Sequence, residues 1–154
     1  MKIILTAIVP RRSRTKADAF ENLVDEYAAR AARYNPIESQ HFESESTFLE
    51  WTSSQPGRVT PYLILLDSRG KQLSSEELAT TVGTHRDQGT QRLIFAIGPA
   101  DGWSESVRKR ADFLLSLGRI TLPHQLARVV LAEQTYRALT ILANHPYHSG
   151  HSGH

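Results

Sequence analysis

The chain has 154 residues, a length that fits one domain, or one domain that completes its hydrophobic core by dimerising. Its hydrophobic content of 40% excludes disorder as the starting expectation, and a net charge of +2 is too small to indicate a nucleic-acid partner by itself. The absence of cysteine excludes disulfides and thiolate chemistry, and no apolar run reaches the roughly 20 residues of a membrane span, so we expect a soluble, cytoplasmic protein with no membrane partner.

The first part of the chain predicts two strands and a helix but no chemical site. Residues 2–9, KIILTAIV, form an apolar run typical of a buried strand, and residues 37–42 fit a second strand. Between them, residues 16–34 predict a helix, because apolar side chains recur at helical spacing: Phe20, Leu23, Val24, Tyr27 and Ala31. Residues 43–51 fit one or two further helical turns.

Four cations follow the first strand: Arg11, Arg12, Arg14 and Lys16. They form either a solvated turn or a loop that contacts phosphate groups. A glycine fingerprint is absent at this place, and the chain has no GxxxxGK[ST] motif. Neither a dinucleotide-binding Rossmann domain nor a P-loop is therefore indicated.

Strands and helices alternate through the middle of the chain. Residues 62–67 and 92–97, YLILLD and RLIFAI, are typical of buried strands, and the segment 113–122 reads as extended but broken at Gly118. Ser74 and Glu77 fit a capping box at the start of a helix that ends near residue 86. A turn is predicted at residues 68–71 and a short helix at residues 104–111.

This alternation indicates an α/β domain with a mainly parallel sheet and helices on both faces. Ligands of such sheets bind beyond the carboxyl ends of the strands. Three segments should therefore meet at one site: residues 66–70, 98–102 and 117–122.

The last helical segment is apolar on more than one face between Leu126 and Leu142. A surface helix normally has a single apolar stripe, so this helix should be buried on two sides. Two interpretations stay open, a core helix of a monomer and a helix covered by a second subunit. Pro146 must end the helix, which leaves Tyr147 and His148 free to point elsewhere.

The same region carries a family resemblance. Residues 122–138, LPHQLARVVLAEQTYRA, with NHPYH at residues 144–148, closely resemble the C-terminal signature of the bacterial 23S rRNA (pseudouridine-1915-N3)-methyltransferases. These are small SPOUT-class enzymes, trefoil-knotted methyltransferases that use S-adenosylmethionine. The similarity extends over the whole chain, is dense from Leu65 onward and is weak at residues 11–58. It implies a SPOUT-like fold with a C-terminal trefoil knot, a feature too rare to predict from periodicity.

The resemblance also implies a cofactor site. In the family, S-adenosylmethionine is held by a leucine and a glycine at two strand ends and by six residues before the Pro-His pair. The matching positions here are Leu66, Gly98, Leu117, Gly118, Arg119, Ile120, Thr121 and Leu122. A large side chain at Gly98 is then expected to block the cofactor and leave the fold intact. One departure is that Pro99 follows Gly98 where the family usually has a second glycine, which removes a backbone donor.

Three residues are candidates to act on the acceptor base, the base that would receive the methyl group. Arg137 could stabilise the uridine anion or bind a flanking phosphate, and Tyr147 could stack on a base. His148 or Tyr147 could relay the proton. Against this, Arg137 stands four residues after Glu133 and could simply pair with it, and His124 could cap the last helix.

The regular spacing of His145, His148, His151 and His154 could suggest a metal site, but prolines, glycines and the lack of nearby carboxylates argue against one, so we predict none. We expect one SPOUT-like domain over residues 1–148 and a flexible tail over residues 149–154.

The resulting expectation is a homodimeric enzyme that uses S-adenosylmethionine to methylate N3 of a pseudouridine in 23S rRNA, in the large subunit or the assembled ribosome. Two alternatives stay open: a SPOUT methyltransferase for another uridine, and a non-catalytic RNA- or ribosome-binding protein of the same fold.

Overall fold

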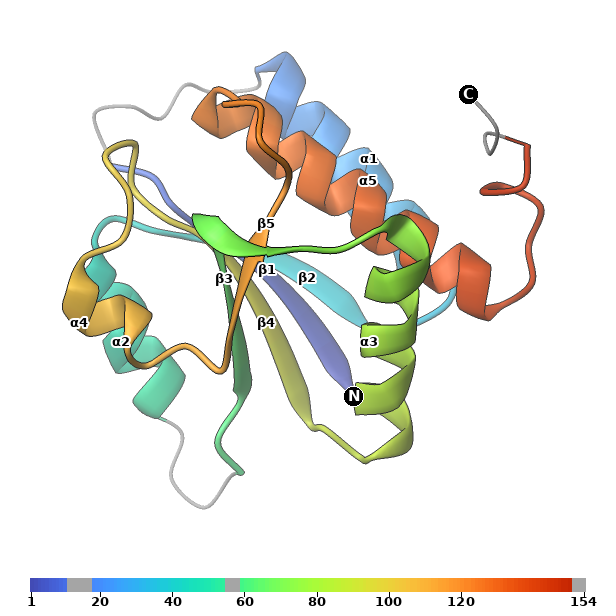
Figure 1. Ribbon diagram of the computed structural model, residues 1–154, viewed down its shortest axis with the longest axis horizontal. Helices are drawn as coiled ribbons and strands as arrows, with labels where there is room; N and C mark the ends of the chain where they lie inside the picture. The colour runs from blue at the N-terminus through green and yellow to red at the C-terminus, as the bar shows by residue number, and fades with distance from the viewer. Residues whose placement is uncertain (11–17, 55–58, 151–154) are drawn as a thin grey trace.

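The computed structural model describes residues 1–10, 18–54 and 59–150. The four N-terminal cations at residues 11–16 and the last four residues of the predicted flexible tail lie outside this part, so both expectations stay predictions. The described residues form a five-stranded parallel sheet with the strand order β2-β1-β4-β3-β5 (Figure 1). The strands are β1 (Lys2–Ile8), β2 (Ile37–Phe42), β3 (Tyr62–Gln72), β4 (Arg92–Ile97) and β5 (Phe113–Ser116).

Helices cover both faces of the sheet, as predicted. On one face lie α1 (Ala19–Ala31), α3 (Ser75–Asp87) and α5 (His124–Leu142), and on the other lie α2 (Glu45–Ser53) and α4 (Glu105–Arg108) (Figure 1). The strand side chains alternate between the two layers. In β1, Ile3 and Leu5 pack under α1, α3 and α5, whereas Ile4 and Ile8 pack against α2 and α4. Because both faces are covered, the central strands are apolar at nearly every position, as expected of a parallel sheet.

The capping box at the start of α3 is confirmed. The Ser74 hydroxyl accepts a hydrogen bond from the Glu77 backbone N–H at 3.0 Å, and the Glu77 carboxylate accepts one from the Ser74 N–H at 2.8 Å. The bond from the Ser74 N–H to the carboxylate is the main cause that lowers the pKa of Glu77, and the Ser74 side chain adds to it, since both favour the ionised form.

The predicted turn at residues 68–71 is wrong, because β3 continues through it to Gln72. The strand shifts its register against β5 between Leu66 and Lys71. Gly70 allows this: a Cβ atom there would lie 2.5 Å from the backbone of Leu114. Of the extended segment predicted over residues 113–122, only Phe113–Ser116 forms a strand, β5, which ends before Gly118.

The predicted apolar stripe of α1 is only partly buried. Val24 and Ala31 face the core, but Phe20 and Leu23 are 36% and 40% exposed. The predicted helix over residues 104–111 shortens to α4, Glu105–Arg108.

One chain covers much of α5 by itself. Leu131, Ala132, Ala138 and Leu139 are buried against the sheet, α1 and α3. Leu126, near the start of the helix, stays 38% exposed. Apolar content alone therefore does not require a second subunit, and the dimer stays a prediction.

Within the described ranges, none of the helices combines the length and apolar character needed to span a bilayer. The trefoil knot also stays a prediction.

Candidate cofactor site and C-terminal cluster

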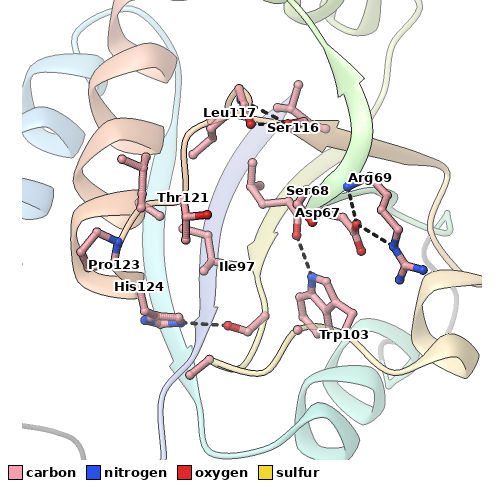
Figure 2. Close-up of a pocket in the computed structure, with 18 of the residues that line it drawn as sticks. Asp67, Ser68, Arg69, Ile97, Trp103, Ser116, Leu117, Thr121, Pro123 and His124 are labelled. Atoms are coloured by element: carbon pink, nitrogen blue, oxygen red, sulfur yellow. Dashed lines mark hydrogen bonds and ion pairs between the residues drawn. The ribbon is translucent and has the colours of Figure 1, made fainter.

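A cavity of about 650 Å³ opens at the carboxyl ends of β3, β4 and β5 (Figure 2). This volume lies within the usual range for small-molecule sites. All eight residues that the resemblance assigned to the cofactor line this cavity: Leu66, Gly98, Leu117, Gly118, Arg119, Ile120, Thr121 and Leu122. The structure thus brings the complete predicted set together, although their contact with a cofactor stays a prediction.

Trp103 forms one wall of the cavity, and sequence reasoning did not single it out. Its indole Nε1–H donates a hydrogen bond to the Leu66 backbone oxygen at 3.1 Å (Figure 2). Its ring also lies against Gly98, where a Cβ atom would come within 2.8 Å of the indole. A side chain at Gly98 must therefore displace a tryptophan that is only 6% exposed. We therefore expect a large residue at Gly98 to disturb the packing of Trp103 as well as to block the cofactor, in contrast to the expectation from the sequence that the fold would stay intact.

His124 joins the start of α5 to the end of β4. Its Nε2 lies 2.9 Å from the Gly98 backbone oxygen, which requires the Nε2–H tautomer as donor (Figure 2). Burial lowers the pKa of His124 and outweighs the bond to Gly98, and the nearby Arg128 cation lowers it further. The alternative interpretation of His124 as a helix cap is wrong. The N-cap of α5 is Pro123, and no side chain makes a capping hydrogen bond at this end.

The loop after β5 offers unused polar groups to a ligand. Ser116 anchors its start, because its Oγ donates to the Gly118 oxygen at 3.0 Å and accepts from the Gly118 N–H at 3.1 Å. Beyond that point, no hydrogen bond among the described residues uses a backbone group of residues 119–122. Ile120 is 81% exposed, although it is a large apolar residue. Free amide groups beside an uncovered apolar side chain fit an adenine ring with polar edges and apolar faces.

The conformation of this loop depends on Gly118, whose φ of +124° is unfavourable for residues with a Cβ. We expect Gly118→Ala to weaken S-adenosylmethionine binding about ten-fold, because the loop must change its backbone path. Calorimetric titration of the purified variant measures this.

Gly89 provides a matched control. It also has a positive φ, +80°, and a Cβ at either glycine would meet no atom within 4 Å. It follows α3 and does not line the cavity. Both alanine variants should lose about 1–2 kcal/mol of stability, but Gly89→Ala should keep its cofactor affinity. Equal affinities of the two variants would contradict the assignment of the loop.

Asp67 has a structural position at the rim of the cavity. One carboxylate oxygen accepts from the Arg69 backbone N–H at 2.8 Å, and the other lies 3.6 Å from Nε of Arg108. This carboxylate, which lies within β3, is therefore bound by the Arg69 backbone and the Arg108 side chain.

The three candidate acceptor residues form a second cluster at the other end of α5. Glu133 is its centre: it binds Arg137 at 2.7 Å and accepts the Tyr147 hydroxyl at 2.6 Å. The Arg137 guanidinium lies 3.0 Å from Nδ1 of His148 and 4.8 Å from the centre of the Tyr147 ring. His148 also pairs with Glu76 through Nε2. The pairing of Arg137 with Glu133, which competed with a catalytic interpretation, is thus present.

Electrostatics fix the protonation states in this cluster. Burial would raise the pKa of Glu133, but hydrogen bonds from Arg137 and Tyr147 outweigh it, so its pKa is lowered. Burial and the bond to Glu133 raise the pKa of Tyr147 well above its usual value. Tyr147 therefore stays a phenol at neutral pH and is a poor general base.

The tail is not free to point elsewhere, as the sequence had suggested. The Tyr147 ring packs edge-on against Tyr136, with ring centres 4.7 Å apart, and its hydroxyl is bound by Glu133.

The C-terminal cluster lies far from the cavity along α5. Arg137 lies thirteen residues after His124, which corresponds to about 20 Å along the helix axis. None of the three candidate acceptor residues lines the cavity of its own chain.

Sequence comparison decides the family. The family model described as "Predicted SPOUT methyltransferase" matches residues 1–148. The chain belongs to the SPOUT methyltransferase family. A "Ribosomal RNA large subunit methyltransferase H" from Koribacter versatilis is 54% identical over 138 residues, which cover 90% of this chain and 94% of that protein. A protein of the same name from Mesorhizobium japonicum is 41% identical and covers 96% of this chain and 99% of its own length.

A solved structure agrees with this SPOUT assignment at the level of fold. The probable methylase family protein from Haemophilus influenzae Rd KW20 aligns with a TM-score of 0.54 at 11% identity, over 94% of this chain and 69% of that one. At this identity the likeness shows the fold alone.

The lowered pKa of His124 predicts a pH effect in this SPOUT chain. Its ordinary pKa is 6.5, and burial lowers the value in the folded state, so the unfolded chain takes up a proton first as pH falls. Buried His85, whose pKa is also lowered, acts in the same direction. The free energy of unfolding should therefore have its largest value above about pH 7 and should decrease as the pH falls towards about 5.

Denaturant unfolding at a series of pH values measures this effect. The variant His124→Asn, which keeps a donor for Gly98, should show a smaller decrease than the parent. An identical pH profile in the two proteins would show that His124 does not contribute.

Proposed function

We propose that this chain is an S-adenosylmethionine-dependent methyltransferase that methylates N3 of a pseudouridine in 23S rRNA of the large ribosomal subunit. The observation that carries this proposal is the cavity at the ends of β3, β4 and β5, which gathers all eight cofactor positions of the family. The relatives with this fold and length support it, since they are named as large-subunit rRNA methyltransferases.

The cavity fits the cofactor chemically as well as by volume. Leu66, Leu117 and Ile120 offer apolar surface for the two faces of an adenine ring, and the loop amides of residues 119–122 offer groups for its edge. S-Adenosylmethionine supplies a methyl group on a positively charged sulfur. The chain must hold this group in line with the acceptor nitrogen, and positioning of this kind can supply a large part of a rate enhancement.

The acceptor nitrogen must lose its proton before or during methyl transfer. Arg137 is suited to stabilise the resulting anion, because its guanidinium is always a cation and its bonds to Glu133 hold it in place. The Tyr147 ring is suited to stack on a base, but its raised pKa removes the hydroxyl as the proton acceptor, and its one hydrogen is donated to Glu133. In the structure both ring nitrogens of His148 are engaged, by Arg137 and Glu76.

The separation of the two clusters supports a homodimer. A cofactor in the cavity and an acceptor base near Arg137 of the same chain would lie too far apart for methyl transfer. A second copy that brings its C-terminal cluster to this cavity would complete the site. The active form is therefore a homodimer with composite sites, and we place it with the ribosome in the cytoplasm.

Two experiments test the function. Calorimetric binding of S-adenosylmethionine separates an enzyme from a non-catalytic RNA-binding protein of the same fold, which should not bind the cofactor. Mass mapping of rRNA modifications in a strain that lacks the gene should show the loss of one methyl group on a 23S rRNA pseudouridine. Loss of a methyl group from another uridine would favour the alternative substrate.

A further inference from the structure

Trp103 connects two strand ends that form the floor of the cavity. Its Nε1–H binds the Leu66 oxygen at the end of the first half of β3, and its ring lies directly against Gly98 after β4. On its other side the indole packs on Phe48, with ring centres 5.7 Å apart. One side chain thus links the α2–α4 layer to two of the predicted cofactor positions.

The bond to Leu66 fixes the orientation of a peptide group at the cavity. The Leu66 oxygen accepts the indole N–H, so the peptide group between Leu66 and Asp67 cannot rotate without breaking this bond. Leu66, whose backbone carries this oxygen, also lines the cavity. The Trp103 bond therefore determines the shape of a surface that the ligand must contact.

A hydrogen-bonded turn precedes Trp103 in the chain. The Gly102 N–H donates to the Pro99 oxygen at 2.8 Å, and Gly102 has a φ of +89°. Proline restricts φ at the first position of this turn. Pro99, which stands in place of the second family glycine, opens this turn, and Trp103 directly follows its last residue, Gly102.

We propose that Trp103 is a positioning residue for the cofactor, which holds Leu66 and Gly98 in the conformation that binds S-adenosylmethionine. This inference rests on the proposed function, because it concerns the same cavity. It assigns a role in binding to a residue of the α2–α4 layer, and it explains why Gly98 must be glycine: the indole occupies the space of its Cβ.

Fluorescence gives a direct test, since the chain has only two tryptophans. Trp51 lies on α2 and does not line the cavity. In a Trp51→Phe variant, all tryptophan emission comes from Trp103. Addition of S-adenosylmethionine should change the intensity or wavelength of this emission, with the same midpoint as calorimetric binding.

Affinity measurements test the positioning role. Trp103→Phe keeps a ring against Gly98 but loses the N–H, and it should weaken S-adenosylmethionine binding about five-fold. Trp103→Leu should weaken it more. Val107→Ala is the matched control, because Val107 is 2% exposed in the same apolar cluster but does not line the cavity. It should lower the unfolding temperature and keep the parental affinity.

The outcomes separate the inference from the proposed function. Parental affinity in Trp103→Phe and unchanged emission on binding would overturn the inference alone. Failure of the parent protein to bind the cofactor would overturn the proposed function and the inference together. If Trp103→Leu does not fold, the conservative Trp103→Phe variant and the emission measurement still decide.

Discussion

Removal of residues 147–154 is expected to abolish methyl transfer to 23S rRNA and to leave S-adenosylmethionine binding close to the parental value. Tyr147 and His148 lie beside Arg137, and none of the three lines the cavity of its own chain. The cofactor should therefore bind without them, whereas the acceptor base should lose the stacking surface of Tyr147 and the imidazole of His148 beside Arg137. Methylation of ribosomal particles from the deletion strain measures activity, and calorimetry measures binding.

The shorter deletion of residues 149–154 is the control. In the described part of this segment, the Ser149 hydroxyl and the Gly150 N–H bind the Pro146 oxygen within the tail itself. The shorter deletion should therefore change little. Full activity in the longer deletion would show that Tyr147 and His148 are dispensable, and loss of cofactor binding would show that the tail is structural.

The packing of the tail adds an expected effect on stability. Tyr147 contacts Tyr136 and donates to Glu133, so the longer deletion should lower the free energy of unfolding by about 1–2 kcal/mol. Tyr147→Phe keeps most of this packing and tests the hydroxyl by itself. It should lose the part of the stability that the bond to Glu133 provides, about 1 kcal/mol, and keep the part from ring packing. Its activity should stay close to the parental value if the ring alone serves the acceptor base.

The layers and the place of the site could be predicted from the sequence, because both follow from periodicity. Apolar runs such as residues 62–67 and 92–97 alternate with helical segments, which leaves few arrangements other than a parallel sheet covered on both faces. In that arrangement, the segments after three strands must meet at one edge. The individual residues at that edge came from the family resemblance.

The features that could not be predicted from the sequence depend on contacts between residues far apart in the chain. Residues 68–71 have the composition of a turn, but Gly70 is small because it passes close to the backbone of Leu114. Trp103 looked like an ordinary apolar residue of a loop, and its role appears only when β3 and β4 place Leu66 and Gly98 beside it. No local pattern contains either contact.

The C-terminal helix shows the limit of an argument from composition. Its apolar residues suggested a face left for a partner, but the sheet, α1 and α3 cover Leu131 and Leu139 to 2% exposure within one chain. On α1 and α5, three large apolar side chains remain exposed: Phe20 and Leu23 of α1 and Leu126 of α5, at 36%, 40% and 38%. These two helices pack side by side (Figure 1). Exposed apolar residues indicate an interface where they form one patch, so these two neighbouring helices are the place where we propose that a second copy binds.

A charge in this uncovered region is therefore expected to break up the dimer. The parent should have the mass of a dimer in light scattering at micromolar concentration, and Leu126→Asp should have that of a monomer. A charge at Leu131 is a poor test, since this residue is buried within its own chain and the variant should unfold. Val59→Asp is the matched control, because Val59 is 62% exposed and follows α2, away from α1 and α5.

Leu126→Asp should also lose methyl transfer, since the cavity of one copy would no longer meet the C-terminal cluster of the other. A monomeric parent with full activity would refute both the dimer and the composite site.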